Sequence, residues 1–281
     1  MIQKGDWVCR KSYGRDMVFY VERIRPEGLV ILSGVEYRIA ADAWPEDLVV
    51  LEANYARGMR RREAVRIQEK IEELKARHAK AGLSGPGSFP KNVRILHLDG
   101  DSEYLRLCTQ YYQELGLEVY GEAVEEKRQP LEVLRYLRQY RPDILVVTGH
   151  DSVPKEAENL LRADAYRSSL YFAETVRRAR SFEPDMDRLV IIAGACQSYY
   201  ELLMEAGANF ASSPGRVLIH AMDPVILCAE IAYTPIQERV DVEAAVALTF
   251  SGTEGIGGYD TMGKGRRGYP SGRRKIQSWG A

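Results

Sequence analysis

The chain has 281 residues, of which 45% are hydrophobic and 28% charged, and its formal net charge is −1. These proportions are typical of a soluble globular protein. A charge so close to zero creates no overall field that would draw the chain to nucleic acid or to an anionic membrane. No apolar run approaches the roughly 20 residues that a membrane-spanning helix needs, and the first residues lack the apolar core of a signal peptide. We therefore expect a cytoplasmic protein with no nucleic-acid or membrane partner.

The four cysteines are widely spaced and form no Cys-x-x-Cys pair. This spacing shows neither a disulfide framework nor clustered metal ligands, so we expect a reducing compartment, no metal ion and no cofactor. Cys9, Cys108 and Cys228 lie in apolar or helical patterns that suit buried thiols. Cys196 differs, because it follows an apolar run that ends in small residues.

Short apolar runs alternate with turn residues over residues 1–53. The expected strands cover residues 7–9, 17–21, 29–32, 37–39 and 48–51. Strands at this spacing are typical of a small SH3-like β module, either a barrel or a curled sheet. Packing or docking is the plainest role for such a module.

A basic helix and a linker are expected over residues 54–90. Ile67, Ile71 and Leu74 recur at helical spacing in a segment rich in Arg, Lys and Glu. Because no aromatic residues are interleaved with the basic ones, a solvated helix face is favoured over a nucleic-acid contact. The Gly-, Pro- and Ser-rich stretch 81–90 predicts a linker, so the main domain is expected to begin at residue 91.

Strands and helices alternate through the main domain, residues 91–281. Strands are expected at 93–98, 118–124, 143–148 and 189–193, with short candidates at 209–212 and 217–220. Helices are expected at 102–115, 131–140, 168–182, 199–206, 223–231 and 240–250. Such alternation predicts a mainly parallel sheet with helices on both faces. The last thirty residues, rich in Gly, Lys and Arg, are expected to form a flexible basic tail.

Two of the expected strands end in small residues followed by a chemically competent side chain. His150 follows one strand in Thr-Gly-His-Asp, and Cys196 follows another in Ala-Gly-Ala-Cys-Gln-Ser. Parallel strands deliver catalytic groups at their carboxyl ends, and an imidazole beside a thiol suffices for nucleophilic acyl transfer. A helix starting at Gln197 would favour the thiolate and offer N–H groups to an oxyanion. The alternatives are a strand-end histidine and a buried structural cysteine.

This pair of motifs resembles those of the caspase-like cysteine peptidases, the group that includes clostripain, gingipains and legumain. Cys196 lies 46 residues after His150 (196 − 150 = 46), and each follows an apolar run and small residues. More closely, the whole chain resembles sporulation-specific peptidases of this kind. The segments that carry that similarity are residues 5–16, 42–48, 148–151, 194–198 and 255–260. One departure is Asp151, which stands where most caspase-like enzymes have glycine.

The resemblance implies a caspase-like peptidase with His150 as base and Cys196 as nucleophile. It also implies cleavage after Arg or Lys. The implied substrates are coat- and cortex-associated spore proteins, cleaved in the sporulating cell and at the forming spore. The basic sequences at 60–62, 266–267 and 273–275 are candidate sites of self-processing, because we expect them in accessible segments.

A preference for Arg or Lys requires a carboxylate in the first substrate pocket, since a buried guanidinium without a partner is costly. By resemblance, one wall of that pocket is the end of the first strand, where Asp99 and Asp101 stand. We favour Asp101 over Asp99, and we take Ser212 as part of a second wall. The alternative is that both aspartates only cap the following helix. Asp151 and Asp223 are the next carboxylates to consider.

Two other classes of protein fit parts of the sequence. A receiver-like or other flavodoxin-like signalling domain would use Asp99 and Asp101 to hold Mg²⁺. A noncatalytic binding protein associated with the spore coat would leave Cys196 as an ordinary buried thiol.

Overall fold

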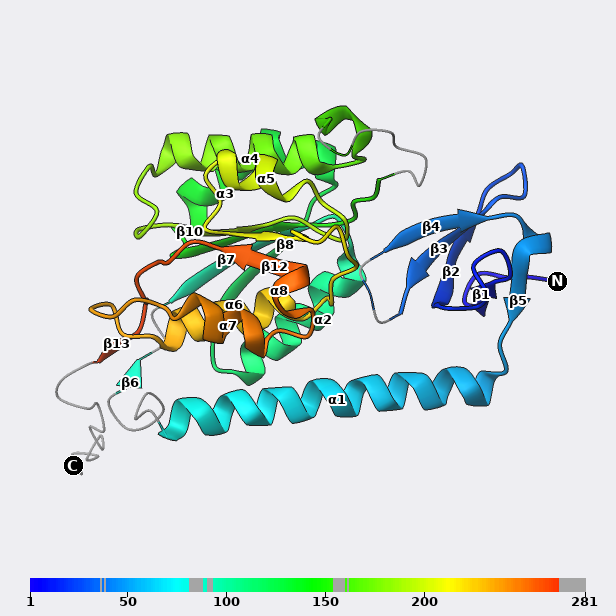
Figure 1. Cartoon of the computed structure of the whole chain (residues 1–281), viewed down its shortest axis with the longest axis horizontal. Helices are drawn as coiled ribbons and strands as arrows, with labels where there is room; N and C mark the ends of the chain where they lie inside the picture. Colours follow the sequence, from blue (N-terminus) through cyan, green and yellow to red (C-terminus); the bar gives the residue numbers. More distant parts are fainter. Residues whose placement is uncertain are drawn as a thin grey trace, which may run out of the picture.

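Two β-sheets, with helices around the larger one, give a mixed α/β fold (Figure 1). The computed structural model describes residues 1–35, 37, 39–80, 88–89, 93–153, 160 and 162–267. The linker expected at 81–90 and the end of the basic tail, from residue 268, lie outside this part of the chain, except for residues 88–89.

The larger sheet has six strands in the order β12-β11-β10-β9-β7-β8. Their bounds are β7 (Arg94–Asp99), β8 (Glu118–Ala123), β9 (Ile144–Thr148), β10 (Val190–Ala193), β11 (Phe210–Ser212) and β12 (Ile256–Gly258). All neighbours are parallel except β12, which pairs antiparallel with β11. Strands β9 and β10 are buried along their whole length, as their unbroken apolar sequences predict for strands covered on both faces. The expected mainly parallel sheet is thus confirmed.

Helices cover both faces of this sheet (Figure 1). On one face lie α3 (Gln129–Tyr140), α4 (Ser169–Phe182) and α5 (Tyr200–Glu205). On the other lie α2 (Ser102–Glu114), α6 (Asp223–Tyr233), α7 (Val242–Leu248) and the short α8 (Gly252–Gly255). Short 3₁₀ turns are η1 (Pro45–Asp47), η3 (Glu126–Arg128) and η4 (Ala163–Ala165). Each face has its own hydrophobic core, and every residue of α6 is buried because α1 covers its outer side.

The N-terminal module is a five-stranded antiparallel sheet in the order β4-β3-β2-β1-β5. Its strands are β1 (Trp7–Arg10), β2 (Val18–Ile24), β3 (Val30–Gly34), β4 (Ala40–Ala43) and β5 (Leu48–Val50). One prediction is wrong here, since the fourth strand covers Ala40–Ala43 rather than residues 37–39. Tyr37 instead makes a single antiparallel bridge to His220 of the larger domain, a long-range contact that no local pattern signals.

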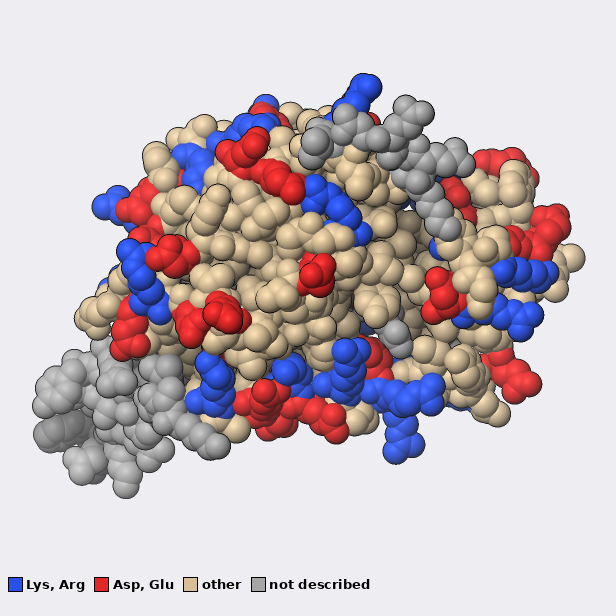
Figure 2. Space-filling view, viewed as in Figure 1, with Lys and Arg blue, Asp and Glu red and all other residues tan. Residues whose placement is uncertain are grey.

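Helix α1 (Ala53–Lys80) joins the two parts and confirms the predicted helix (Figure 1). Ile67, Ile71 and Leu74 are buried in the core beneath it. At its far end His78 lies 2.8 Å from Glu230 of α6. Figure 2 shows acidic and basic side chains interleaved along this edge of the molecule, which agrees with the solvated helix face. No helix among the described residues is long and apolar enough to cross a membrane.

Three further expectations are wrong. Residues 217–220 form no strand, and the region after residue 251 is not wholly irregular, because it contains α8, β12 and β13 (Arg266–Arg267). Strand β13 pairs with β6 (Ser88–Phe89), so these short strands depend on partners distant in sequence. The basic sequence 60–62 lies within α1, where a helical backbone cannot adopt the extended form expected of a cleavage site.

One tyrosine of α2 makes two contacts with the N-terminal module. The Tyr104 hydroxyl lies 2.5 Å from the carbonyl oxygen of Gly34 and 2.8 Å from that of Tyr37. Its ring centroid lies 6.1 Å from that of His150. The module is therefore anchored on a side chain that lies beside the expected catalytic histidine.

We expect Tyr104→Phe to lower the free energy of unfolding by about 1–2 kcal/mol, since it removes the buried hydroxyl that donates to the carbonyl groups of the module. Urea unfolding measures the loss. Tyr111→Phe is the matched control on the same helix, because the Tyr111 hydroxyl makes no hydrogen bond with the residues that the structure describes. Equal stabilities for the two variants would contradict the anchoring role of Tyr104.

Candidate active site

His150 and Cys196 lie just beyond the carboxyl ends of the neighbouring parallel strands β9 and β10. Val190 lies opposite Ile144, and the same offset separates the two candidate residues (190 − 144 = 196 − 150 = 46). The sheet order β8-β7-β9-β10 places the topological switch point between β7 and β9. Ligand sites of open α/β sheets lie outside the carboxyl ends of the strands at such a point. His150 is thus placed where this architecture builds its sites.

The buried carboxylate of Asp151 joins the histidine loop to the cysteine loop. Its Oδ1 accepts the backbone N–H groups of Ser152 (2.9 Å) and Ser168 (2.7 Å). Its Oδ2 accepts the hydroxyl groups of Ser169 (2.5 Å) and Ser198 (2.9 Å). Ser198 lies two residues after Cys196, so one side chain fixes both loops relative to the first turn of α4.

Cys196 lies in a tight turn rather than at a helix start. Gln197 has a left-handed backbone (φ 57°), and α5 begins only at Tyr200, so the expected helix start at Gln197 is wrong. The sulfur instead interacts with the main chain of Ile219, whose N–H donates to Sγ at 3.2 Å and whose carbonyl accepts from it at 3.6 Å. The Cys196 side chain is 0% exposed, because this segment covers it.

Gly194, just before the cysteine turn, has a backbone that only glycine adopts easily (φ 110°). A Cβ atom there would lie 2.8 Å from Leu203 Cδ1 and 3.0 Å from Ser212 Cβ. The small residues noted in the sequence thus allow the chain to turn closely against β11 and α5.

His150 lies between two carboxylates that come from different strand ends. Asp101 Oδ2 is 3.4 Å from His150 Nε2, and Glu126 Oε1 is 3.8 Å from Nδ1. Glu126 Oε1 also accepts the backbone N–H of His150 at 2.7 Å. The three side chains are 13–16% exposed, so the acidic surroundings of the histidine remain in contact with solvent.

Glu126 is a site residue that sequence analysis did not identify. It lies after β8, in a charged stretch that matches no motif. Gly100 and Gly149 make room for it, since a Cβ at either position would lie within 2.3 Å of Glu126 Oε1. The sequence signal for such a group is the pair of glycines after β7 and β9, because glycine at a strand end indicates that another group approaches the backbone closely.

The structure separates the three predicted pocket residues. Asp99 is 0% exposed and lies beside His97, with Nε2 to Oδ2 at 3.4 Å. Ser212 is 2% exposed at the end of β11. Asp101 caps α2 and faces His150. Of the three, only Asp101 combines partial exposure with proximity to the histidine.

The two further carboxylates considered from sequence both hold the chain together. Asp151 binds the loops described above, and Asp223 accepts the backbone N–H groups of His220 (3.1 Å) and Phe250 (2.8 Å). Burial raises the pKa of Asp223.

The Mg²⁺ site of the receiver-like alternative has no counterpart in the described part of the chain. There, no group of three or more His, Cys, Asp or Glu side chains is placed to hold a metal ion. Asp99 Oδ1 accepts the backbone N–H of Asp101 at 2.9 Å, so this carboxylate is used within the protein.

An α/β sheet that carries a histidine and a cysteine on adjacent strand ends, beside carboxylates, is suited to hydrolysis by acyl transfer. Comparison with known proteins defines the class as a peptidase: the family model described as YabG peptidase U57 matches residues 3–270. The chain belongs to this family and acts on peptide bonds. It is 39% identical over 289 residues to the sporulation-specific protease YabG of Bacillus subtilis (strain 168), covering 95% of this chain and 98% of that protein. No solved structure matches significantly.

Replacing the carboxylate that joins the two loops tests its role. We expect Asp151→Asn to lower the free energy of unfolding by about 1–3 kcal/mol, because an amide cannot accept from all four donors. Burial raises the pKa of Asp151, although the hydrogen bonds from Ser169, Ser168 and Ser198 oppose that shift. A raised folded-state pKa means that the contribution of this carboxyl is full at low pH and declines as pH rises through the folded-state value.

The loss caused by Asp151→Asn should therefore be largest at acid pH and shrink as pH rises above about 4, the ordinary value for aspartate. Urea unfolding at several pH values measures it. Asp164→Asn serves as the control, because that side chain is 59% exposed, and its stability should stay close to that of the wild type at every pH. A loss that grows with pH would instead show that the Asp151 pKa is lowered by folding.

Proposed function

We propose that this chain is a cysteine endopeptidase of sporulation with Cys196 as nucleophile and His150 as base. The observation that carries the proposal is the position of the two residues just beyond the carboxyl ends of adjacent parallel strands, reinforced by the Asp151 carboxylate that joins their loops. Membership in a peptidase family supplies the reaction, and the similar protease of Bacillus subtilis supplies the setting. A caspase-like fold agrees with this strand order, with the histidine and the cysteine following successive strands.

The reaction proceeds by two transfers of the acyl group. His150 takes the thiol proton as Cys196 Sγ attacks the carbonyl carbon, and it then passes that proton to the leaving amine as the C–N bond breaks. Water attacks the resulting thioester while His150 accepts a proton from it. The C–S bond breaks, the proton returns to sulfur, and the second product is an acid.

The oxyanion is assigned to the backbone N–H of Cys196, which lies next to the attacking sulfur. The N–H of His150 is unsuited to that role in this structure, because it donates to Glu126 at 2.7 Å. Substrate must also reach a sulfur that is 0% exposed. Access therefore requires the segment around Ile219 to move away from Cys196.

Cleavage after Arg or Lys is part of the proposal. A basic side chain needs a carboxylate partner in its pocket, and Glu126 offers one beside His150. Its Oε1 holds the histidine loop, while Oε2 makes no hydrogen bond or ion pair with the described residues. We assign the pocket charge to Glu126 rather than to the predicted Asp99 or Ser212, which are buried.

The proposed substrates are spore proteins, including those of the coat, and the chain itself. For self-processing, the basic pair 266–267 lies in β13 and must leave β6 before it can be cut. The basic sequence 273–275 lies outside the described residues.

The dyad is tested by replacing each member. We expect Cys196→Ala and His150→Ala each to lower kcat on an Arg-containing peptide by at least about 10³-fold, since neither residue can act without the other. Peptide hydrolysis measures activity, and urea unfolding checks that the fold persists. Cys108→Ala is the matched control, because that thiol is also buried. Activity of either dyad variant near that of the wild type would refute the mechanism.

The same proteins test self-processing. Wild-type protein incubated alone should shorten at a basic residue, and Cys196→Ala should keep its mass. If the wild-type protein stays intact while it cleaves peptides, self-processing is refuted.

The pocket assignment is tested with Glu126→Gln, which keeps an oxygen that can accept from the His150 N–H. We expect kcat/KM for Arg and Lys peptides to fall by roughly 10- to 100-fold, with little change for a neutral residue at the same position. Glu125→Gln is the control, because its side chain is 55% exposed beside Lys127. An unchanged preference in Glu126→Gln would place the pocket carboxylate elsewhere.

A further inference from the structure

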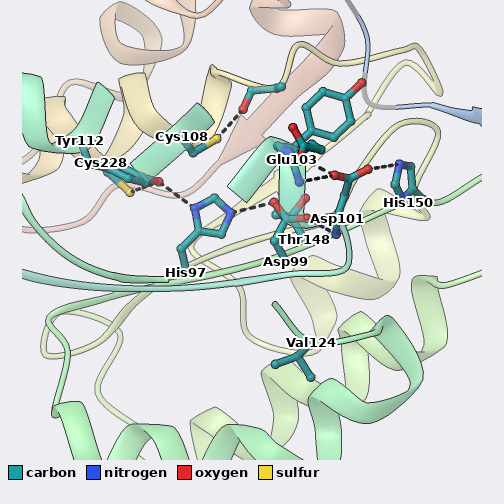
Figure 3. A network of polar contacts seen from close by, with 12 residues as sticks. His97, Asp99, Asp101, Glu103, Cys108, Tyr112, Val124, Thr148, His150 and Cys228 are labelled. Carbon is teal, nitrogen blue, oxygen red and sulfur yellow. Dashed lines mark hydrogen bonds and ion pairs between the residues drawn. The ribbon is translucent and has the colours of Figure 1, made fainter. Parts of the chain in front are cut away.

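We propose that Asp101 is a positioning residue for His150 and that the buried His97–Asp99 pair beneath it fixes Asp101 in turn. The inference rests on the proposed Cys196–His150 mechanism. It replaces the role in substrate binding that the sequence suggested for Asp101 with a role in orienting the base. Figure 3 shows the chain of contacts that carries it.

Both oxygens of Asp101 are committed to the protein. Oδ1 accepts the backbone N–H groups of Glu103 (2.8 Å) and Tyr104 (3.1 Å) at the start of α2. Those bonds fix the rotation of the carboxylate, so Oδ2 faces His150 Nε2 at 3.4 Å (Figure 3). Helix α2 thus sets the direction of the group that meets the imidazole.

A second polar layer lies directly below. Asp99 Oδ1 accepts the N–H of Asp101 at 2.9 Å, and Asp99 Oδ2 lies 3.4 Å from His97 Nε2. On the other side of that ring, Nδ1 lies 3.3 Å from the Tyr112 hydroxyl. Asp99 and His97 are fully buried, so the main chain of Asp101 is held by a side chain that lies in the interior of the protein (Figure 3).

The chemical consequence is a preference for one tautomer of His150. A proton on Nε2 faces the Asp101 carboxylate, which leaves the lone pair on Nδ1 to accept the thiol proton. The imidazolium that forms is stabilised by the Asp101 charge, while the proton stays on the ring. The charged or polar groups that face His150 include Asp101, Glu126 and Tyr104 from α2.

A helix cap alone would not need Oδ2 to face an imidazole, and a pocket residue would contact substrate rather than the base. The three roles differ in what they change. A cap changes stability only, a pocket residue changes KM and the preference for Arg, and a positioning residue lowers kcat for every substrate and moves the pH profile.

The decisive variants are Asp101→Asn and Asp101→Ser in the full chain, because both residues still cap a helix. Asn presents an N–H₂ group to Nε2 and favours the opposite tautomer. We expect kcat to fall by on the order of 100-fold or more in Asp101→Asn and by less in Asp101→Ser, with KM for an Arg peptide within about twofold. Asp99→Asn should show the same pattern more weakly.

A second readout is independent of substrate. Iodoacetamide should modify Cys196 more slowly near neutral pH in Asp101→Asn than in the wild type, and the rate should recover only at higher pH. The reason is that the thiolate then loses its stabilised imidazolium partner. Asp164→Asn is the exposed control and should match the wild type in both assays.

The outcomes separate this inference from the function beneath it. If Cys196→Ala and His150→Ala are inactive but Asp101→Asn keeps the wild-type kcat and alkylation profile, the positioning role is overturned and the peptidase mechanism stands. A rise in KM confined to basic substrates, with kcat unchanged, would assign Asp101 to the substrate pocket and would also overturn the positioning role. If Cys196→Ala is active, the proposed function fails and this inference fails with it.

Discussion

The candidate site depends on one buried carboxylate, Asp151. Parallel strands place their following residues at one edge of the sheet, but loops beyond the strand ends have no hydrogen-bond ladder to hold them. Asp151 supplies that constraint by accepting four hydrogen bonds from the histidine loop, the start of α4 and the cysteine loop. This arrangement removes the Asp151 carboxylate from water, which disfavours its charged form and raises its pKa. Glycine at this position would leave those donors without an acceptor.

The environment of His150 follows from the switch point of the sheet. From β7 the chain goes to β8 on one side, and it then crosses to β9 on the other side of β7. The loops that follow these strands bring Asp101, Glu126 and His150 together from three separate parts of the chain. The two carboxylates place negative charge beside the imidazole, where the proposed mechanism generates a positive charge as His150 takes the thiol proton. The site is thus acidic around the base and mainly uncharged around the sulfur, where Ile219 provides only main-chain contacts.

The N-terminal module is joined to both halves of this site. On the histidine side its carbonyl groups accept a hydrogen bond from the Tyr104 hydroxyl. The backbone N–H of Tyr104 in turn donates to the Asp101 carboxylate. On the cysteine side Tyr37 bridges to His220, the residue after the one that covers the sulfur. Helix α1 adds a third connection, because Glu63 contacts the His220 ring at 2.5 Å. These contacts make the module part of the framework around the site rather than a separate attachment.

Local pattern alone determined most of the elements, since unbroken apolar runs specify buried strands and helical periodicity specified α1 and its buried face. It also identified His150 and Cys196, because strand ends with small residues are legible in a linear sequence. Tertiary structure decided what surrounds them. Glu126 joins the histidine only because the fold brings the end of β8 against Gly100 and Gly149. Asp99 faces His97 because residues two apart on a strand share one side of the sheet. Asp101 lies beyond the strand and faces His150 because the first N–H groups of α2 fix its rotation. Short strands such as β12 and β13 exist only through partners far along the chain, and no local propensity records such pairing.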